Sequence, residues 1–361
     1  MRKGFFGIFM KVALILVNYN GEKYLRGLFH SLSQLRFPKE ACDIFFIDNA
    51  SSDNSLTVVQ NMEHHVARKL IIIKNDTNRG FTGGHNRAFS YLLSKQEYTH
   101  CALLNIDTTV HEDWLAELIA AVESTEEIGI AQSLILFEND PRFVNTAGNV
   151  MHYLGFGWCG SYKRPAVEIP REAVVDIGYA SGAGMIIKRS VLEKIGCFEE
   201  AFFMYHEDLD LSWRARLAGF RIVRAPRSLV YHMYEFGRNK RKWFFSERNR
   251  LLTFFSLYRK KTIVVFLFPF VVVEIGMALV SLTNGWFIEK VRSYADVIHA
   301  RGLIAQRRKW AEHFRISPDR AIMSYMHPRL EFSEVPSSFG LLCVNIFLTG
   351  YWYIARFLIR W

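Results

Sequence analysis

Short apolar segments alternate with helical patterns in the N-terminal part of the chain, and this alternation limits the folds open to it. The strand-like segments are residues 12–17, 42–50, 70–75 and 100–107. One helical pattern begins after residue 21, and three others lie around residues 54–67, 84–96 and 112–123. Strands that alternate with helices predict an α/β fold with a mostly parallel sheet, covered by helices on both faces.

Polar residues stand where each of these predicted strands ends. In chain order they are Asn18 and Tyr19, Asp48 and Asn49, Asn75 and Asn78, and Asn105 and Asp107. The carboxyl ends of parallel strands meet at one edge of a sheet, and ligands of such sheets bind there. We therefore expect one ligand site along this edge.

The positive charge of the chain is confined to its last third. Residues 1–230 carry 25 Lys and Arg against 26 Asp and Glu, whereas residues 231–361 carry 20 against 9. Nucleic acid and an anionic membrane surface both attract such a region. The same third holds the two longest apolar segments, which favours the membrane, and no nucleic-acid-binding motif accompanies the charge. We expect no nucleic-acid partner.

The cysteines exclude two other classes of protein. There are five, an odd number, they are scattered along the chain, and no CxxC pair occurs. This pattern argues against a disulfide-stapled fold and against a zinc site, and it indicates a reducing compartment.

Several motifs in this order resemble those of the family-2 glycosyltransferases. They are "ILVNYNG", "FFIDNASSDNS", "NRGFTGGHN", "LLNIDTTV", "GAGMIIKRSVLEKIGCFEE" and "HEDLDLSWRARLAG". The resemblance covers roughly residues 12–255 and is nearest to the branch that includes rhamnosyltransferases acting on lipid-linked glycans. It implies the GT-A fold, which is Rossmann-like, and an inverting transfer from a dTDP- or UDP-linked sugar, dTDP-rhamnose for example. The implied acceptor is a polyprenyl-linked glycan in cell-envelope polysaccharide assembly.

The "NID" motif is the predicted metal site. A hard cation that neutralises a departing diphosphate prefers oxygen ligands, and Asp107 is the only carboxylate that this strand end supplies. The resemblance makes Asp107 a ligand of Mg²⁺ or Mn²⁺, with Asn105 at the degenerate first position beside the substrate. It also places His232 near the metal or the diphosphate. The alternatives are that Asp107 caps the next helix near His111 and that His232 is structural.

The resemblance assigns further residues to the nucleotide sugar. Asp48 would accept a hydrogen bond from the imide N–H of uracil or thymine, and Tyr19 would flank the base. Asn18, Asn78, Gly83 and Asn86 would complete the donor site, with Arg87 as a weaker candidate, and the glycines of "RGFTGG" let backbone approach a ligand closely. Asp53 is better explained as a helix cap.

Three carboxylates, Glu207, Asp208 and Asp210, follow the apolar "FFMYH" and begin a predicted helix. At 100° per residue Asp208 and Asp210 point about 200° apart, so they have different roles. The resemblance makes Asp208 the general base that deprotonates the acceptor hydroxyl, and Glu207 would orient the acceptor. We expect Asp210 to pair with Arg214 at i, i+4, and Leu209, Trp213 and Leu217 to face the core. Acidic residues also favour a helix start in any protein.

The basic segment 237–250 has two interpretations. It would close over the diphosphate through Arg248, or lie on anionic lipid. A Q-x-x-R-W motif, which processive synthases of the superfamily carry, is absent, so we expect a single addition per encounter. Two alternative functions remain. A nucleotidyltransferase should have a Gly-rich basic signature after the first strand, where "NYNGEKYL" stands, and an inactive scaffold should lack Asp107 or Asp208.

The chain divides into a catalytic domain, residues 1–255, and a membrane-associated helical region, residues 256–361. The apolar segments 263–287 and 339–358 are each long enough to span a bilayer. Nucleotide sugars are cytosolic, and residues 288–338 carry nine Lys and Arg, which also favours the cytosol. We therefore expect 263–287 to be re-entrant or to lie in the membrane plane as a helix broken at Pro269, on the cytoplasmic face of the cell membrane. The alternative has two spans, and the oligomeric state is not predicted.

Overall fold

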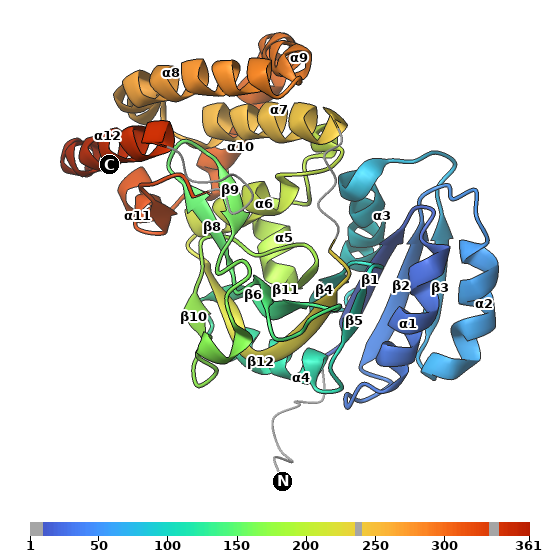
Figure 1. Cartoon of the computed structure of the whole chain (residues 1–361). Coiled ribbons are helices and arrows are strands. Elements are labelled where there is room, and N and C mark those ends of the chain that lie inside the picture. Colours follow the sequence, from blue (N-terminus) through green and yellow to red (C-terminus); the bar gives the residue numbers. More distant parts are fainter. Residues whose placement is uncertain (1–9, 235–239, 332–338) are drawn as a thin grey trace.

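A computed structural model describes residues 10–234, 240–331 and 339–361, and it shows a mixed α/β sheet followed by a helical region (Figure 1). The strands are β1 (Val12–Asn18), β2 (Cys42–Asp48), β3 (Leu70–Lys74), β4 (His100–Leu104), β5 (Thr108–Val110), β6 (Ile128–Phe137), β7 (Val144–Thr146), β8 (Asn149–His152), β9 (Gly157–Cys159), β10 (Val175–Asp176), β11 (Gly184–Lys188), β12 (Arg221–His232) and β13 (Met326–His327). The helices are α1 (Glu22–Ser33), α2 (Ser55–Val66), α3 (Gly80–Ser94), α4 (Trp114–Val122), α5 (Arg189–Ile195), α6 (Glu207–Leu217), α7 (Lys240–Leu257), α8 (Lys260–Thr283), α9 (Phe287–His299), α10 (Arg301–Phe314), α11 (Asp319–Met323) and α12 (Phe339–Leu358), with 3-10 turns η1 (Ala166–Glu168) and η2 (Glu200–Phe202).

The main sheet has two halves of different character. Its strand order is β10-β12-β6-β11-β4-β1-β2-β3, with β5 beside β12 and β7 beside β6. Strands β3, β2, β1 and β4 are parallel, as expected from the alternating pattern. Beyond β4 the sheet is mixed, because β11 runs antiparallel to both β4 and β6. The sequence pattern did not predict the antiparallel pairing in this second half.

The alternation of side chains along β1 explains why helices cover both faces. Val12, Leu14 and Leu16 pack with α1, α2 and α4 on one face, and Ala13 and Ile15 pack with α3, α5 and α6 on the other. All five side chains are buried. A strand that buries both faces carries an unbroken apolar run, and "VALILV" is such a run.

The C-terminal helices share the core of the sheet domain. One continuous apolar cluster contains Trp213 of α6, Tyr258, Phe266 of α8, Phe314 of α10 and Trp352 of α12. The helical region therefore packs directly against the domain, across the boundary predicted at residue 255.

Two helices are long and apolar enough to cross a membrane by length and composition, Lys260–Thr283 and Gly340–Leu358. The first apolar segment ends earlier than predicted, because a turn at 284–286 separates α8 from α9. The expected break at Pro269 is wrong, since α8 continues through it. Proline leaves the carbonyl four residues earlier, that of Val265, without its helical donor, and the Tyr351 hydroxyl of α12 donates to that carbonyl instead.

Candidate active site

Three of the predicted donor residues, Asn18, Tyr19 and Asp48, lie at the carboxyl ends of the neighbouring strands β1 and β2. Asn18 and Asp48 are directly paired in the β1–β2 register, and both are buried. The Asn18 amide donates to Asp48 Oδ1 at 3.3 Å and to Ser51 Oγ at 2.9 Å, and Ser51 N donates to Asp48 Oδ2 at 3.2 Å. Tyr19 follows with 51% of its surface exposed. The arrangement presents an oriented carboxylate beside a free aromatic ring.

Asn49 organises the next part of the rim and was not singled out as a site residue. Its amide donates to Asn78 Oδ1 at 3.0 Å and to the Gly80 carbonyl at 2.9 Å, and its Oδ1 accepts from Asn75 and from Arg79 N. Asn49 is 2% exposed. One buried side chain thus fixes the whole turn into α3, including Asn78, and its strand-end position was the available signal.

Gly80 shows why this turn is glycine-rich. Its φ is +68°, and a Cβ there would lie 2.2 Å from the carbonyl oxygen of Phe203. Side chains are therefore excluded both by conformation and by space. Gly83 and Asn86 lie on α3, and the Asn86 amide exchanges hydrogen bonds with the backbone of Phe198. Within this structure Asn86 joins α3 to the segment that precedes α6, and its role toward a donor stays a prediction.

Asp107 and His232 come together, although 125 positions of chain separate them in the sequence. His232 ends β12, which pairs with β5, and its Nε2 lies 3.3 Å from Asp107 Oδ1. The other ring nitrogen contacts Asn145 Oδ1 at 3.2 Å, which orients the imidazole. The alternative role for Asp107 is excluded, because α4 begins at Trp114 with Asp113 as its cap residue.

Glu138 is a further carboxylate beside this pair, and sequence reasoning missed it. It follows β6 directly, and its backbone N–H donates to the carbonyl of His232. Its Oε1 accepts from Thr109 at 3.3 Å, and its Oε2 is buried without a hydrogen-bond partner. Burial raises the pKa of Glu138, and the nearby charge of Asp107 raises it further. The signal was again a polar residue at a strand end, in "ILFEND".

One other group of metal-ligating side chains occurs among the described residues. His111, Glu112 and Asp113 lie close together at the start of α4. Glu112 and Asp113 both pair with Arg36, at 2.7 and 3.7 Å, which accounts for the cluster without a ligand.

Asp208 lies at the junction of the motif segments. Its carboxylate accepts from its own helix at Leu209 N, 2.8 Å, and from Gly182 N, 3.3 Å. The next residue, Ala183, accepts from Asn105 N through its carbonyl. Two consecutive residues therefore connect the "NID" strand end to the carboxylate predicted to be the base.

The electrostatics of Glu207 and Asp208 differ from those of ordinary surface carboxylates. Burial raises the pKa of Asp208 to about 6, against backbone N–H donors that lower it. Burial and the neighbouring Asp208 raise the pKa of Glu207 well above its usual value, and Glu207 Oε2 has no hydrogen-bond partner. A carboxylate that titrates near neutral pH is suited to accept a proton.

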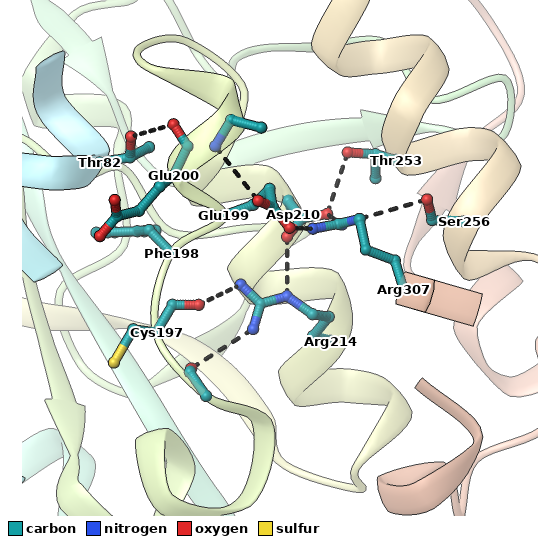
Figure 2. Close-up of polar contacts among 12 residues, drawn as sticks. Thr82, Cys197, Phe198, Glu199, Glu200, Asp210, Arg214, Thr253, Ser256 and Arg307 are labelled. Carbon is teal, nitrogen blue, oxygen red and sulfur yellow. Dashed lines mark hydrogen bonds and ion pairs between the residues drawn. The ribbon is translucent and has the colours of Figure 1, made fainter. Parts of the chain in front are cut away.

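Asp210 has the structural role predicted for it. It is fully buried, and Arg214 Nε donates to its Oδ2 at 2.8 Å. Figure 2 shows two further donors on its Oδ1, Arg307 of α10 and Thr253 of α7. The predicted core residues Leu209, Trp213 and Leu217 are likewise buried. Asp210 thus ties α6 to the helical region.

Arg248 has partners within the protein. Its guanidinium donates to the carbonyls of Ala201 and Phe202 and lies 3.2 Å from Asp296 of α9. Residues 237–239 of the predicted basic segment lie outside the described residues. The contact of Arg248 with a diphosphate stays a prediction.

Comparison with known proteins shows the family of the chain. The model of the glycosyl transferase family 2 matches residues 13–196, just over half of the chain. The chain belongs to glycosyltransferase family 2. It is 27% identical to the rhamnosyltransferase WbbL of Escherichia coli over 269 residues, 69% of this chain and 94% of WbbL. It is 26% identical to a low-salt glycan biosynthesis hexosyltransferase of Haloferax volcanii over 215 residues, 58% of this chain and 63% of that protein.

Shorter and structural matches extend the comparison. An N-acetylglucosaminyl-diphospho-decaprenol L-rhamnosyltransferase of Mycobacterium tuberculosis is 37% identical over 75 residues, 21% of this chain and 24% of that protein. The crystal structure of GalNAc-T7 with UDP, GalNAc and Mn²⁺ has a TM-score of 0.61 at 14% identity, covering 88% of this chain and 56% of that one. TarS of Staphylococcus aureus with UDP-GlcNAc has a TM-score of 0.55 at 16% identity, covering 97% and 92%. This chain has the GT-A fold of glycosyltransferases.

Proposed function

We propose that this glycosyltransferase is an inverting, metal-dependent and non-processive enzyme that moves a sugar from a dTDP- or UDP-linked donor to a polyprenyl-linked glycan. The observation that carries the proposal is the position of Asp208. A half-buried carboxylate whose pKa is raised to about 6 is connected through Gly182 and Ala183 to the strand end that bears Asp107. Hydrogen bonds thus connect Asp208, the proposed base, to the strand end that carries Asp107, the proposed cation ligand.

The reaction follows from that placement. Asp208 accepts the proton of the acceptor hydroxyl as its oxygen bonds to the anomeric carbon of the donor. The bond between that carbon and the diphosphate oxygen breaks on the opposite face, and its electron pair leaves with the diphosphate. Glu207 orients the acceptor, and the apolar residues before it exclude the water that would hydrolyse the donor. Burial and the neighbouring Asp208 raise the pKa of Glu207 well above its usual value, which favours its protonated form.

Asp107 and His232 fit a divalent cation such as Mg²⁺ or Mn²⁺. They offer an oxygen and a nitrogen donor 3.3 Å apart, and Asn145 fixes the histidine ring. A cation held there would neutralise negative charge on the diphosphate. Asp48 and Tyr19 would recognise the pyrimidine, and Asn18 holds Asp48 in position for it.

The lipid-linked acceptor requires that the site meets a membrane. Helices α8, α9 and α12 expose apolar side chains to an unusual extent. On α8 these are Val264 (71% exposed), Phe268 (60%), Ile275 (59%) and Leu279 (60%), and on α12 they are Ile346 (67%), Tyr353 (66%) and Phe357 (70%). We call the exposed apolar side chains of α8, α9 and α12 the apolar surface. Surfaces of this kind mark contact with lipid or with another protein.

The inner side of α8 indicates how it meets the membrane. Phe270 stacks on Phe254 of α7 with ring centroids 5.0 Å apart, and Glu274 contacts Arg250 of α7 and Lys290 of α9. A helix that left α7 to span a bilayer would carry Glu274 into lipid without these cations. Figure 1 shows α8 lying along the helical end of the molecule rather than projecting from it. We propose that α8 lies in the membrane plane at the cytoplasmic face, with its apolar stripe in lipid.

Two measurements test the proposed function. The first is thermal stabilisation of the purified protein by dTDP-rhamnose, UDP-linked and GDP-linked sugars, with and without Mn²⁺ or Mg²⁺. A metal-dependent shift with a pyrimidine donor is expected. The second is transfer to a lipid-linked acceptor and to the same sugar free in solution, at matched concentration in detergent. Equal rates would mean a soluble acceptor, and no transfer with any donor would favour the inactive scaffold.

The membrane proposal has its own test. The double substitution Phe268→Glu with Ile275→Glu should abolish flotation with vesicles of mixed anionic and neutral phospholipid, at low and high salt. Val175→Glu, an exposed apolar residue on β10, is the matched control and should float like the parent. If the double variant floats normally but loses a dimer peak in detergent, the apolar surface is a subunit interface instead.

A further inference from the structure

The chain reaches Glu207 through a strained loop. Phe203, Tyr205 and His206 have φ values of +63°, +65° and +72°, in the left-handed region that bulky residues rarely adopt. His206 is the N-cap residue of α6, so this backbone sets the direction in which the first turn of the helix begins. Strained backbone of this kind persists only where its surroundings hold it, and it concentrates at functional sites.

Asn249 of α7 is the main contact that holds this loop. It is fully buried, and its amide nitrogen donates to the carbonyls of Phe202 at 3.0 Å, Met204 at 3.0 Å and Tyr205 at 2.8 Å. Two amide hydrogens shared among three carbonyls require those carbonyls to converge on one point.

The neighbours of Asn249 complete the support. Arg248 Nε donates to Asn249 Oδ1 at 3.0 Å, which fixes the orientation of the amide, and its guanidinium also reaches the carbonyls of Ala201 and Phe202. Thr82 N, in the first turn of α3, donates to the carbonyl of Phe203 at 3.2 Å, where Gly80 permits close approach. Phe245 of α7 stacks on Phe203 with ring centroids 5.4 Å apart.

Ion pairs with α8 and α9 hold the same helical turn of α7 in place. Glu247 and Arg250 are both buried, and they form ion pairs with Lys290 of α9 and Glu274 of α8 respectively. These contacts hold the α7 turn that carries Asn249. They are distinct from the Asp210 cluster, which holds the body of α6 through Thr253, Arg214 and Arg307.

We propose that Asn249 is a positioning residue for the reaction, holding the strained 202–206 loop so that Glu207 and Asp208 face the acceptor. The inference rests on the proposed function, because it assigns the work of Asp208 to general-base catalysis. It adds a residue of α7, 41 positions beyond Asp208 in the sequence, to the residues that position the catalytic carboxylates.

The decisive variant is Asn249→Ala. It removes all three donations, so the loop relaxes and the carboxylates move. A displacement of about 1 Å costs about 10²-fold in turnover, and we expect kcat to fall by that order while donor affinity in Mn²⁺ is unchanged. Relaxation also admits water to Asp208, whose ionisable neighbours are Glu207 and Tyr179. The acid limb of the pH–rate profile should therefore move below that of the parent.

Thr253→Val is the matched control. Thr253 is equally buried, lies one turn further along α7, and donates to Asp210 rather than to the loop. We expect it to lower the melting temperature without moving the acid limb. If Asn249→Ala does not fold, Arg248→Lys keeps a charge for Asp296 but cannot support both carbonyls, and should shift kcat and the acid limb in the same directions.

Hydrogen exchange separates this inference from the proposed function. Amides of residues 203–209 should exchange faster in Asn249→Ala than in the parent, while those of β1 and β2 keep their rates. This readout needs no substrate, so it decides the role of Asn249 in the loop even if no donor is transferred. Unchanged exchange in the loop, or a folded variant with the kcat and acid limb of the parent, would overturn the proposal.

Discussion

The predicted donor edge of the sheet and the loop before α6 are held in place by different kinds of contact. Asn18 and Asp48 are adjacent because β1 and β2 pair in register, and the turn into α3 is fixed by Asn49 at the end of β2. The 202–206 loop has no such register to fix it. It depends on Asn249 and Arg248 of α7, and α6 depends on Arg307 of α10.

This difference has a consequence for substitutions. The donor edge is supported by strand pairing within residues 12–107, and most changes there should affect one ligand contact at a time. The proposed acceptor side, at the start of α6, is supported from the helical region that also carries the apolar surface. Changes there should affect stability and turnover together, and the following predictions separate the two sides.

Asp208→Asn has the largest expected effect. General-base catalysis is worth roughly 10²–10⁴-fold, so turnover should fall by that amount while nucleotide-sugar binding persists. Steady-state transfer and calorimetric donor binding measure the two quantities. Asp176→Asn, which alters a carboxylate on edge strand β10 paired with Arg221, is the control. Near-parental transfer by Asp208→Asn would remove it as the base.

Arg307→Met tests the support of α6. It takes one cation from fully buried Asp210 and leaves Arg214 and Thr253. Breaking a buried ion pair typically costs about 3–5 kcal/mol of unfolding free energy. Denaturant unfolding measures this loss, and Lys309→Met, an exposed change on the same helix, should be neutral. An unaltered midpoint would mean that α6 is held without α10.

Asp107→Asn acts on the donor side alone. Even partners outside the ligand shell change metal affinity or activity by about 10–100-fold, so loss of a ligand should weaken Mn²⁺-dependent donor binding at least that much. Calorimetry with and without Mn²⁺ checks this. Asp113→Asn, in the half-buried cluster just before α4, should bind donor like the parent. If the two variants exchange these behaviours, the metal lies at 111–113.

The pH dependence of transfer should report on Asp208. Its pKa is raised to about 6, and as the proposed base it acts in its deprotonated form. Activity is therefore retained above pH 6 and falls about tenfold for each unit below it. A pH–rate profile of kcat measures this limb. Asp107→Asn should lower the plateau but leave the limb in place, whereas a limb that moves with Asp107 would assign the titration to the donor side.

Much of the donor side was predictable from sequence because its signals are local. Alternating apolar segments gave β1 to β4, and residues at their ends gave Asp48 and Asp107. The i, i+4 spacing gave the Asp210–Arg214 pair, which is confirmed. The continuity of α8 was not predictable, because the partner of the Val265 carbonyl is Tyr351, 86 positions away.

By itself the sequence determined which residue types stand at strand ends and which helix faces are apolar, since hydrophobic periodicity depends only on neighbours along the chain. It also placed three carboxylates at the start of one helix. Tertiary structure decided that Asp208, the proposed base, is half-buried and that Asp210 is a buried ion-pair partner. It also brought Glu138 and His232 to Asp107, and Asn249 to a loop whose strain no local pattern records. The physical reason is that burial and charge pairing are set by residues far apart in the sequence. The pKa of a carboxyl depends on the burial, charges and hydrogen bonds around it in the folded structure.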